Sequence, residues 1–251
     1  MLRVLVTGFR PWTGVTYNPS GVVATRLHGA RLSSLHYGHP HTATVRGIVL
    51  DVAWTGGTTS GGASVQSAAA TLAAEATAYN PHLIVSFGVI PDESHVFDVE
   101  PNASDDSDYR DVLGNLPPSR RMHASDPLTL TLTFATDHIR DEMNRRLPSP
   151  FRAVSNPGLG SYLCERVAYE GARLQRLRAP PTGATTGSWI WASGFIHVPN
   201  PLHAAAGRSD ADVSTLTTAQ QAVFRTSEAT IVDGARHAVC AALGRLPATL
   251  R

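Results

Sequence analysis

Apolar runs and helical patterns alternate along this chain of 251 residues. Short runs rich in Val, Ile and Leu predict buried strands at residues 3–9, 44–54, 81–89, 128–134, 151–156 and 188–199, the last with a break near Gly194. Apolar residues spaced three and four apart predict helices at 18–29, 64–80, 135–147, 161–177 and 214–246, the last as one long helix or two shorter ones. Residues 92–127 are polar and rich in turn signals, so we expect them to be irregular.

This alternation indicates an α/β fold. We expect a three-layer αβα single domain over residues 1–251, with a mostly parallel, twisted central sheet and no internal repeat or linker. In such folds, ligands bind beyond the carboxyl ends of the strands. We therefore expect functional residues just after four strand positions, which are Val6, Phe87, Val154 and Ile196.

The composition of the chain limits its possible partners and its cellular location. The formal net charge is +1, which gives no reason to expect nucleic acid or an anionic membrane as a partner. No apolar run approaches the ~20 residues that span a bilayer, and the opening "MLRVLVTGF" is too short for a signal peptide. The two cysteines do not form a disulfide scaffold. We expect a cytoplasmic protein with both thiols reduced.

The basic residues exclude several kinds of chemistry. All 21 are arginine and none is lysine, which excludes a Schiff-base lysine, a phosphate-loop lysine and a lysine general base. A histidine cluster in "HYGHPH", residues 36–41, lies in a proline-containing loop and is not expected to be a designed metal site. We expect neither a metal nor a cofactor.

Cys164 falls in the first turn of the helix predicted at 161–177. Cysteine attacks as a thiolate, and the free N–H groups at a helix N-terminus stabilise that anion. The glycines at 158 and 160 allow close backbone approach to a substrate, and the free amides there provide a candidate oxyanion hole. A single cysteine on an apolar helix face is more often a packing residue. The interpretation of Cys164 as a nucleophile therefore requires a general base nearby. Cys240, among apolar neighbours in the last helix, is expected only to pack.

His197 is the candidate base, because it lies at the end of the predicted strand in "SGFIHVP". Its side chain would therefore reach the edge of the sheet where the carboxyl ends of the strands meet and the active site is expected. Most histidines have structural or surface roles, and the other histidines fit that interpretation. A third group should orient the imidazole. Composition alone does not choose among six carboxylates, which are Asp98, Glu100, Asp105, Asp106, Asp108 and Asp111.

Three segments, taken in order, resemble pyroglutamyl peptidase I (pyrrolidone-carboxylate peptidase), a family of cysteine peptidases that remove N-terminal pyroglutamate. They are "VTGFRPWTGVTYNPS" at 6–20, "VSNPGLGSYLCE" at 154–165 and "SGFIHVP" at 193–199. A weaker fourth match runs from Val99 to Asn115, and the resemblance covers about residues 1–200. It indicates a divergent member of that family.

The resemblance implies roles for individual residues. Cys164 matches the nucleophile, His197 the general base and Glu100 the carboxylate that orients the histidine. Arg110 matches an arginine placed near the oxyanion. For the substrate, Phe9 and Trp12 match two aromatic residues that contact the pyroglutamyl ring, and Asn18 an asparagine that shapes the substrate loop. Pyroglutamate is a flat, neutral lactam, so stacking and backbone hydrogen bonds must recognise it.

The chain also departs from the family pattern. Arg10 stands where an acid is common, and the stretch "FGVIPDES" at 87–94 replaces a glycine-rich one, which leaves its shape open.

The leading hypothesis is a cofactor-free cysteine exopeptidase acting on N-terminally pyroglutamylated peptides. One alternative is a related cysteine amidase with altered specificity, and another is a non-catalytic protein that binds pyroglutamyl peptides. The resemblance also allows a homo-oligomer.

Overall fold

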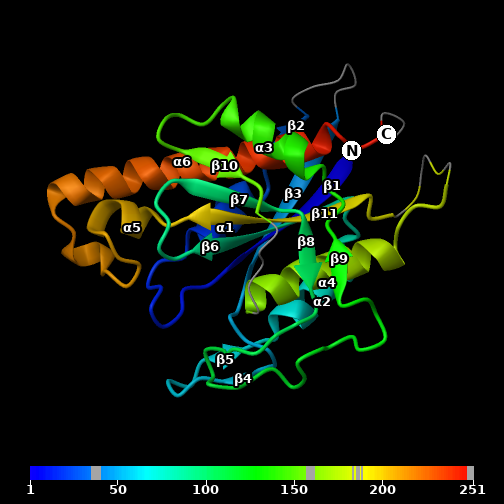
Figure 1. Cartoon of the computed structure of the whole chain (residues 1–251), viewed down its shortest axis with the longest axis horizontal. Coiled ribbons are helices and arrows are strands. Elements are labelled where there is room, and N and C mark those ends of the chain that lie inside the picture. The colour runs from blue at the N-terminus through cyan, green and yellow to red at the C-terminus, as the bar shows by residue number, and fades with distance from the viewer. Residues whose placement is uncertain (35–40, 157–161, 183, 185–186, 188, 248–251) are drawn as a thin grey trace.

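The computed structural model describes residues 1–34, 41–156, 162–182, 184, 187 and 189–247 (Figure 1). Its main feature is a seven-stranded sheet. In spatial order the strands are β10 (Arg152–Val154), β7 (Val96–Glu100), β11 (Ala192–Pro199), β6 (Leu83–Ile90), β1 (Leu2–Phe9), β3 (Thr42–Leu50) and β2 (Arg31–Ser33). The four strands from β11 to β3 run parallel to one another, whereas β7 is antiparallel to β11 and β2 is antiparallel to β3. The predicted α/β fold with a mostly parallel sheet is confirmed.

Helices cover both faces of this sheet, as Figure 1 shows. On one side α1 (Pro19–Leu27) packs on α6 (Thr218–Leu243), and α3 (Thr136–Asn144) also packs on α6. On the other side α2 (Ala68–Tyr79) packs on α4 (Leu163–Leu177). Strands buried on both faces need apolar residues at nearly every position. This is why β1 and β6 read as continuous runs, "LRVLVTGF" and "LIVSFGVI".

Several predicted boundaries change. Residues 92–127 were expected to be irregular, and that expectation is wrong for β7, which lies inside the central sheet. Its buried apolar residues alternate with Asp98 and Glu100, and these carboxylates masked the strand signal. The predicted strand at 128–134 is shorter: β9 (Thr129–Thr131) pairs only with β8 (Asn102–Ser104). A second small hairpin joins β4 (Gly57–Thr58) and β5 (Ser64–Val65).

Two further details concern the last third of the chain. β11 continues through Gly194 without the expected break. Glycine at this position makes room for Phe134, since a Cβ atom there would lie 2.2 Å from its ring. The region 214–246 forms one long helix, α6, which begins with a capping box between Thr217 and Gln220. Before it lie α5 (Pro201–Ala206) and a 3₁₀ turn (Val213–Thr215), neither of which the sequence pattern predicted.

Candidate active site

Four elements meet at the candidate site. His197 lies near the end of β11, Glu100 is the last residue of β7, and Gly88 lies in β6, between β11 and β1. Cys164 is the second residue of α4, which covers this face of the sheet. The sheet therefore supplies the imidazole and the carboxylate, and the helix supplies the thiol.

His197 is held by Glu100. The Nδ1 atom of His197 lies 2.8 Å from Oε1 of Glu100, and the two side chains are 15% and 2% exposed. Within the antiparallel β7–β11 pair, Glu100 is paired with Phe195, two residues before His197. Side chains two residues apart on a strand share one face, so the carboxylate is a diagonal neighbour of the imidazole.

Cys164 and His197 both lie against Gly88. A Cβ atom added to Gly88 would lie 2.9 Å from Sγ of Cys164 and 2.9 Å from Cδ2 of His197. It would also lie 2.9 Å from the ring of Phe195, which packs edge-on against His197 with 4.9 Å between ring centroids. Glycine at this position leaves the space in which the sulfur and the imidazole approach each other. It belongs to the stretch 87–94, whose first four residues continue β6 to Ile90.

Electrostatics favours a charged imidazole at this position. Burial alone would lower the pKa of His197, but hydrogen bonds to Cys164 and Glu100, and the negative charges of both groups, raise it to about 10. Burial raises the pKa of Glu100, although the hydrogen bond to His197 opposes this. Burial also raises the pKa of Asp98, whose Oδ1 accepts the backbone N–H of Asn156.

Glu165, directly after Cys164, is a further buried acid. It is 1% exposed, and its Oε1 accepts the backbone N–H of Ser104 in β8. Burial, together with the charges of Glu100 and Asp106, raises the pKa of Glu165 to about 8, despite the opposing hydrogen bond from Ser104. This shift favours the protonated, neutral form of Glu165 near neutral pH.

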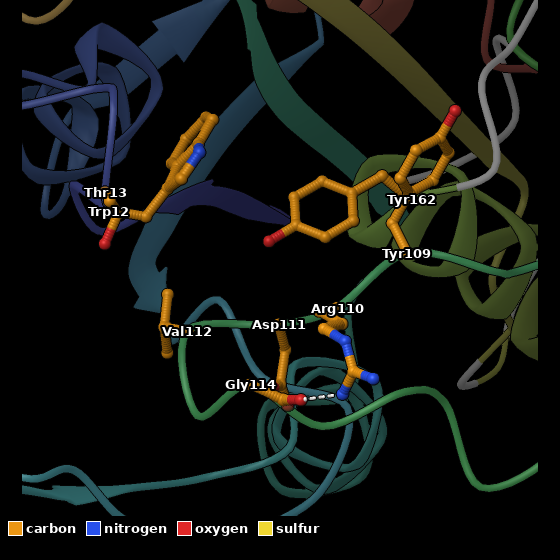
Figure 2. A pocket seen from close by; sticks show the side chains of 8 residues that line it. All are labelled: Trp12, Thr13, Tyr109, Arg110, Asp111, Val112, Gly114 and Tyr162. Atoms are coloured by element: carbon orange, nitrogen blue, oxygen red, sulfur yellow. Dashed lines mark hydrogen bonds between the residues drawn. The ribbon is translucent and has the colours of Figure 1, made fainter.

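A cavity of about 780 Å³ opens beside the N-terminal end of α4 (Figure 2). Figure 2 shows Trp12 on one side and Tyr162 on the other, with Tyr109 next to Tyr162. The ring centroid of Tyr162 lies 6.5 Å from that of Trp12 and 6.3 Å from that of Tyr109. Tyr162 is the N-cap residue of α4, two positions before Cys164, and its side chain does not cap the helix. The remaining lining residues are Thr13, Arg110, Asp111, Val112 and Gly114.

The structure places the other proposed substrate residues differently. Trp12 lines this cavity, whereas Phe9 is 2% exposed and packs in the core at the end of β1. Asn18 is buried and caps α1 through the backbone N–H of Ser20, and its Nδ2 donates to the carbonyl of Arg10 at 3.1 Å. Asn18 therefore shapes the loop that carries Trp12.

Arg110 lies on the cavity wall. It is exposed, and its Nη1 donates to the carbonyl of Gly114 at 2.5 Å. Figure 2 shows the guanidinium turned toward Gly114 and away from the aromatic rings. The glycines at 158 and 160, whose region was expected to provide the oxyanion amides, lie outside the described residues.

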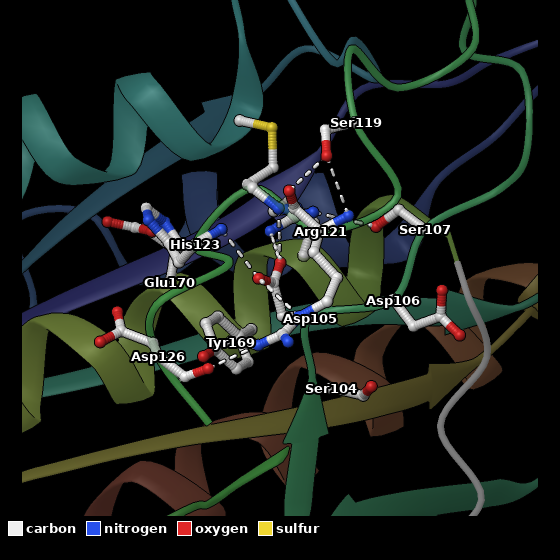
Figure 3. A network of polar contacts seen from close by, with 12 residues as sticks. Ser104, Asp105, Asp106, Ser107, Ser119, Arg121, His123, Asp126, Tyr169 and Glu170 are labelled. Carbon is white, nitrogen blue, oxygen red and sulfur yellow. Dashed lines mark hydrogen bonds and ion pairs between the residues drawn. The ribbon is translucent and has the colours of Figure 1, made fainter. Parts of the chain in front are cut away.

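A buried polar network, part of which Figure 3 shows around Asp105, connects the residues just before Tyr109 and Arg110 to α4. Asp105 is fully buried, pairs with Nη1 of Arg166, and accepts the backbone N–H groups of Met122 and His123 at 3.1 and 2.8 Å. Arg166 also donates to Oγ of Ser107 at 3.3 Å. Because Arg166 follows Cys164 by two residues, the network connects the cavity wall to the helix that carries the nucleophile candidate.

Sequence reasoning missed several of these residues. The sequence did contain a signal for Gly88, since a glycine inside a buried strand often marks a position that another group approaches closely. Tyr162 also had one, because it precedes Cys164 within the matched segment. Tyr109 had none, since its approach to Tyr162 depends on contacts between segments far apart in the chain. Glu165 directly follows Cys164, but nothing in the local sequence signals that its carboxyl group is buried.

An α/β fold in which a cysteine near a helix N-terminus meets a histidine that is oriented by a carboxylate has the arrangement typical of cysteine hydrolases. Comparison with known proteins gives a more particular relationship. The pyrrolidone-carboxylate peptidase of Thermococcus litoralis is 26% identical over 205 residues, which cover 79% of this chain and 77% of that protein. No family model matches the chain.

Solved structures agree in fold. The pyrrolidone carboxyl peptidase of Thermococcus litoralis superimposes with a TM-score of 0.70 at 21% identity, covering 98% of this chain and 95% of that one. A mutant pyrrolidone carboxyl peptidase from Pyrococcus furiosus gives 0.70 at 22% identity, covering 98% and 100% of the two chains. Pyroglutamyl peptidase I from Bacillus amyloliquefaciens gives 0.69 at 18% identity, covering 98% of each. The resemblance inferred from sequence is confirmed, and the chain is a divergent relative of these peptidases.

Proposed function

We propose that this protein is a cofactor-free cysteine exopeptidase that removes N-terminal pyroglutamate from peptides. The observation that carries the proposal is the meeting of Cys164 and His197 over Gly88, with Glu100 bonded to the far side of the imidazole. The names of its relatives supply the substrate class. The proposal treats residues 1–251 as one peptidase domain. A cytoplasmic location and a homo-oligomeric state stay predictions.

In the first step the Cys164 thiolate attacks the carbonyl carbon of the pyroglutamyl residue and forms a carbon–sulfur bond. The raised pKa of His197 keeps its imidazole protonated near neutral pH, so it can donate a proton to the leaving nitrogen as the amide bond breaks. Glu100 holds the ring in position and stabilises its positive charge.

In the second step His197, now neutral, takes a proton from water. The resulting hydroxide attacks the thioester carbonyl, the carbon–sulfur bond breaks, and free pyroglutamate leaves with Cys164 again a thiolate. General acid and base catalysis of this kind contributes about 10²- to 10⁴-fold to the rate.

The cavity fits an uncharged ring. Trp12 and Tyr162 offer aromatic surfaces beside the N-terminal end of α4, and a neutral lactam needs such surfaces more than it needs an ion pair. Arg110 supports the transition state from the cavity wall once its guanidinium turns from Gly114 toward the substrate. Asn18 and Phe9 act indirectly, by shaping and anchoring the loop that carries Trp12.

The experiment is release of a fluorescent amine from a pyroglutamyl amide, with the Cys164→Ala variant as control. Turnover that disappears in Cys164→Ala supports the proposal. Turnover restricted to other amides would identify an amidase of different specificity. Binding of pyroglutamyl peptides without any turnover would identify a binding protein.

Alkylation provides an independent measurement. Both cysteines are free, and Cys164 is half-buried whereas Cys240 is buried. Burial raises the pKa of the Cys240 thiol, so a thiol reagent should modify Cys164 first and activity should fall with that modification. Equal rates at both cysteines would show that Cys164 is not activated.

A further inference from the structure

The aromatic cavity has room for more than one five-membered ring. Its volume of about 780 Å³ lies in the range of pockets that hold drug-sized ligands. The cavity extends from Trp12 to Tyr109, with Tyr162 between them. Cys164 is not among the lining residues, but it follows the lining residue Tyr162 by two positions, so a substrate held at Cys164 can extend along these rings.

The two ends of the cavity differ. Trp12 is half-buried and comes from the loop after β1, which Asn18 fixes through the carbonyl of Arg10. Tyr109 is 59% exposed, an unusual degree for a large aromatic side chain, and it packs edge-on against Tyr162. The Trp12 end is the one proposed for the lactam, so Tyr109 is left for the next part of the substrate.

The charged groups on the wall leave a cationic occupant without a free anion to pair with. The Asp111 carboxylate is already used by three backbone N–H groups, those of Trp54, Leu113 and Asn115, each at 2.9 Å. Arg110 adds a positive charge at the same wall. The two opposite charges offset each other at this wall, and the aromatic rings are left as the surface that a side chain can contact.

We propose that Tyr109, backed by Tyr162, forms a subsite for an aromatic or large apolar side chain on the residue that follows the pyroglutamyl group. This inference rests on the proposed function. It makes the enzyme selective for the second residue of its peptide substrates: aromatic side chains are preferred to alanine, and lysine is disfavoured because it would lose hydration without gaining a free carboxylate partner.

The test compares kcat/KM for three pyroglutamyl dipeptide amides, with phenylalanine, alanine or lysine as the second residue. We expect phenylalanine to exceed alanine by about tenfold, as one well-filled apolar pocket allows, and lysine to fall below alanine. In Tyr109→Ala the preference for phenylalanine over alanine should largely disappear. Tyr109→Phe should keep it, because the ring remains.

Leu177→Ala is the matched control, since Leu177 is 63% exposed at the far end of α4 and should leave all three values unchanged. Equal turnover of the phenylalanine and alanine amides by the unmodified enzyme, or an equal loss on both in Tyr109→Ala, would overturn the subsite while leaving the peptidase in place. A failure to cleave any pyroglutamyl amide would overturn the proposed function and the subsite with it.

Discussion

Oε1 of Glu100 lies 2.8 Å from Nδ1 of His197, and the two residues come from neighbouring strands that run in opposite directions. Because β7 runs against β11, its last residue lies beside the middle of β11, at Phe195. Glu100 therefore reaches the Nδ1 side of the imidazole, while the Cδ2 edge of the same ring faces Gly88 and Cys164. One antiparallel strand in a mostly parallel sheet thus separates the orienting carboxylate from the nucleophile.

Glu100→Gln should lower kcat/KM for a pyroglutamyl amide by about 10²- to 10⁴-fold, because the neutral amide orients the imidazole poorly and does not stabilise its charge. The pH profile should change as well. The charge of Glu100 helps to raise the pKa of His197 to about 10, so the alkaline limb of kcat/KM should lie near pH 10 in the unmodified protein. Without that charge the pKa of His197 falls, and the limb should move to lower pH.

Asp98→Asn is the control for this change. Asp98 lies two residues earlier on the same strand, but it accepts the N–H of Asn156 rather than a hydrogen bond from His197. Its loss should move the alkaline limb less than Glu100→Gln does. Equal shifts in the two variants would mean that His197 responds only to local charge and not to the Glu100 hydrogen bond.

Gly88→Ala should reduce activity strongly, with less effect on folding. The added methyl would lie 2.9 Å from both Cys164 and His197, so these side chains must move apart. A misplacement of about 1 Å costs on the order of 10²-fold in rate, and we expect a loss of that size in kcat/KM.

Gly171→Ala in α4 is the matched control, because its nearest contact would be an ordinary 3.8 Å to Ile84. It should keep activity and gain about 1 kcal/mol of helix stability. Similar losses of activity in both variants would contradict this account of Gly88.

The sequence predicted the fold through the periodicity of its apolar residues, and it placed Cys164 and His197 because both stand at predicted element ends. The structure brings those two side chains together, as the resemblance implied. Glu100 was chosen only by the resemblance. Its strand carries acids at alternate positions within a polar region, so periodicity hid β7 and composition left six equal candidates.

The cavity was much harder to predict. A motif gives the type of a residue but not the direction of its side chain. Phe9 ends a strand that is covered on both faces, so it packs in the core, whereas Trp12 follows the strand and faces the cavity. The approach of Tyr109 to Tyr162 joins positions 53 residues apart, and it depends on the Asp105–Arg166 pair, which has no local sequence signal.

Breaking that pair should strongly destabilise the protein. Arg166 and Asp105 are 2% and 0% exposed at their side chains, so Arg166→Ala leaves a buried carboxylate with only the more distant Arg121, whose Nε lies 3.9 Å from Oδ2 of Asp105. Loss of one partner from a buried ion pair costs about 3–5 kcal/mol, which urea unfolding would measure. We also expect a higher KM, because Arg166 binds Asp105 and Ser107, which lie in the segment that carries Tyr109. Arg120→Ala, which removes the partner of Asp106 from an exposed pair, should leave the urea midpoint almost unchanged. Equal midpoints for the two variants would show that the buried pair contributes no more than a surface pair.

Glu165 should give the protein a stability that falls as pH rises through neutrality. The pKa of Glu165 is raised from 4.5 to about 8 in the folded state, so the folded protein keeps a proton that the unfolded chain has released. Between about pH 5 and pH 8 the free energy of unfolding should therefore decrease with pH, by at most about 1.4 kcal/mol per unit from this group, and become level above pH 8.

Glu165→Gln keeps an oxygen that accepts the N–H of Ser104 but has no proton to lose. Asp98 and Glu100 also have raised pKa values, and they remain in the variant, so subtracting the free energies of unfolding at each pH leaves the contribution of Glu165 together with its coupling to Glu100. We expect the variant to gain on the parent steadily from pH 5 to pH 8, and a constant difference across that range would show that Glu165 is already ionised in the folded protein.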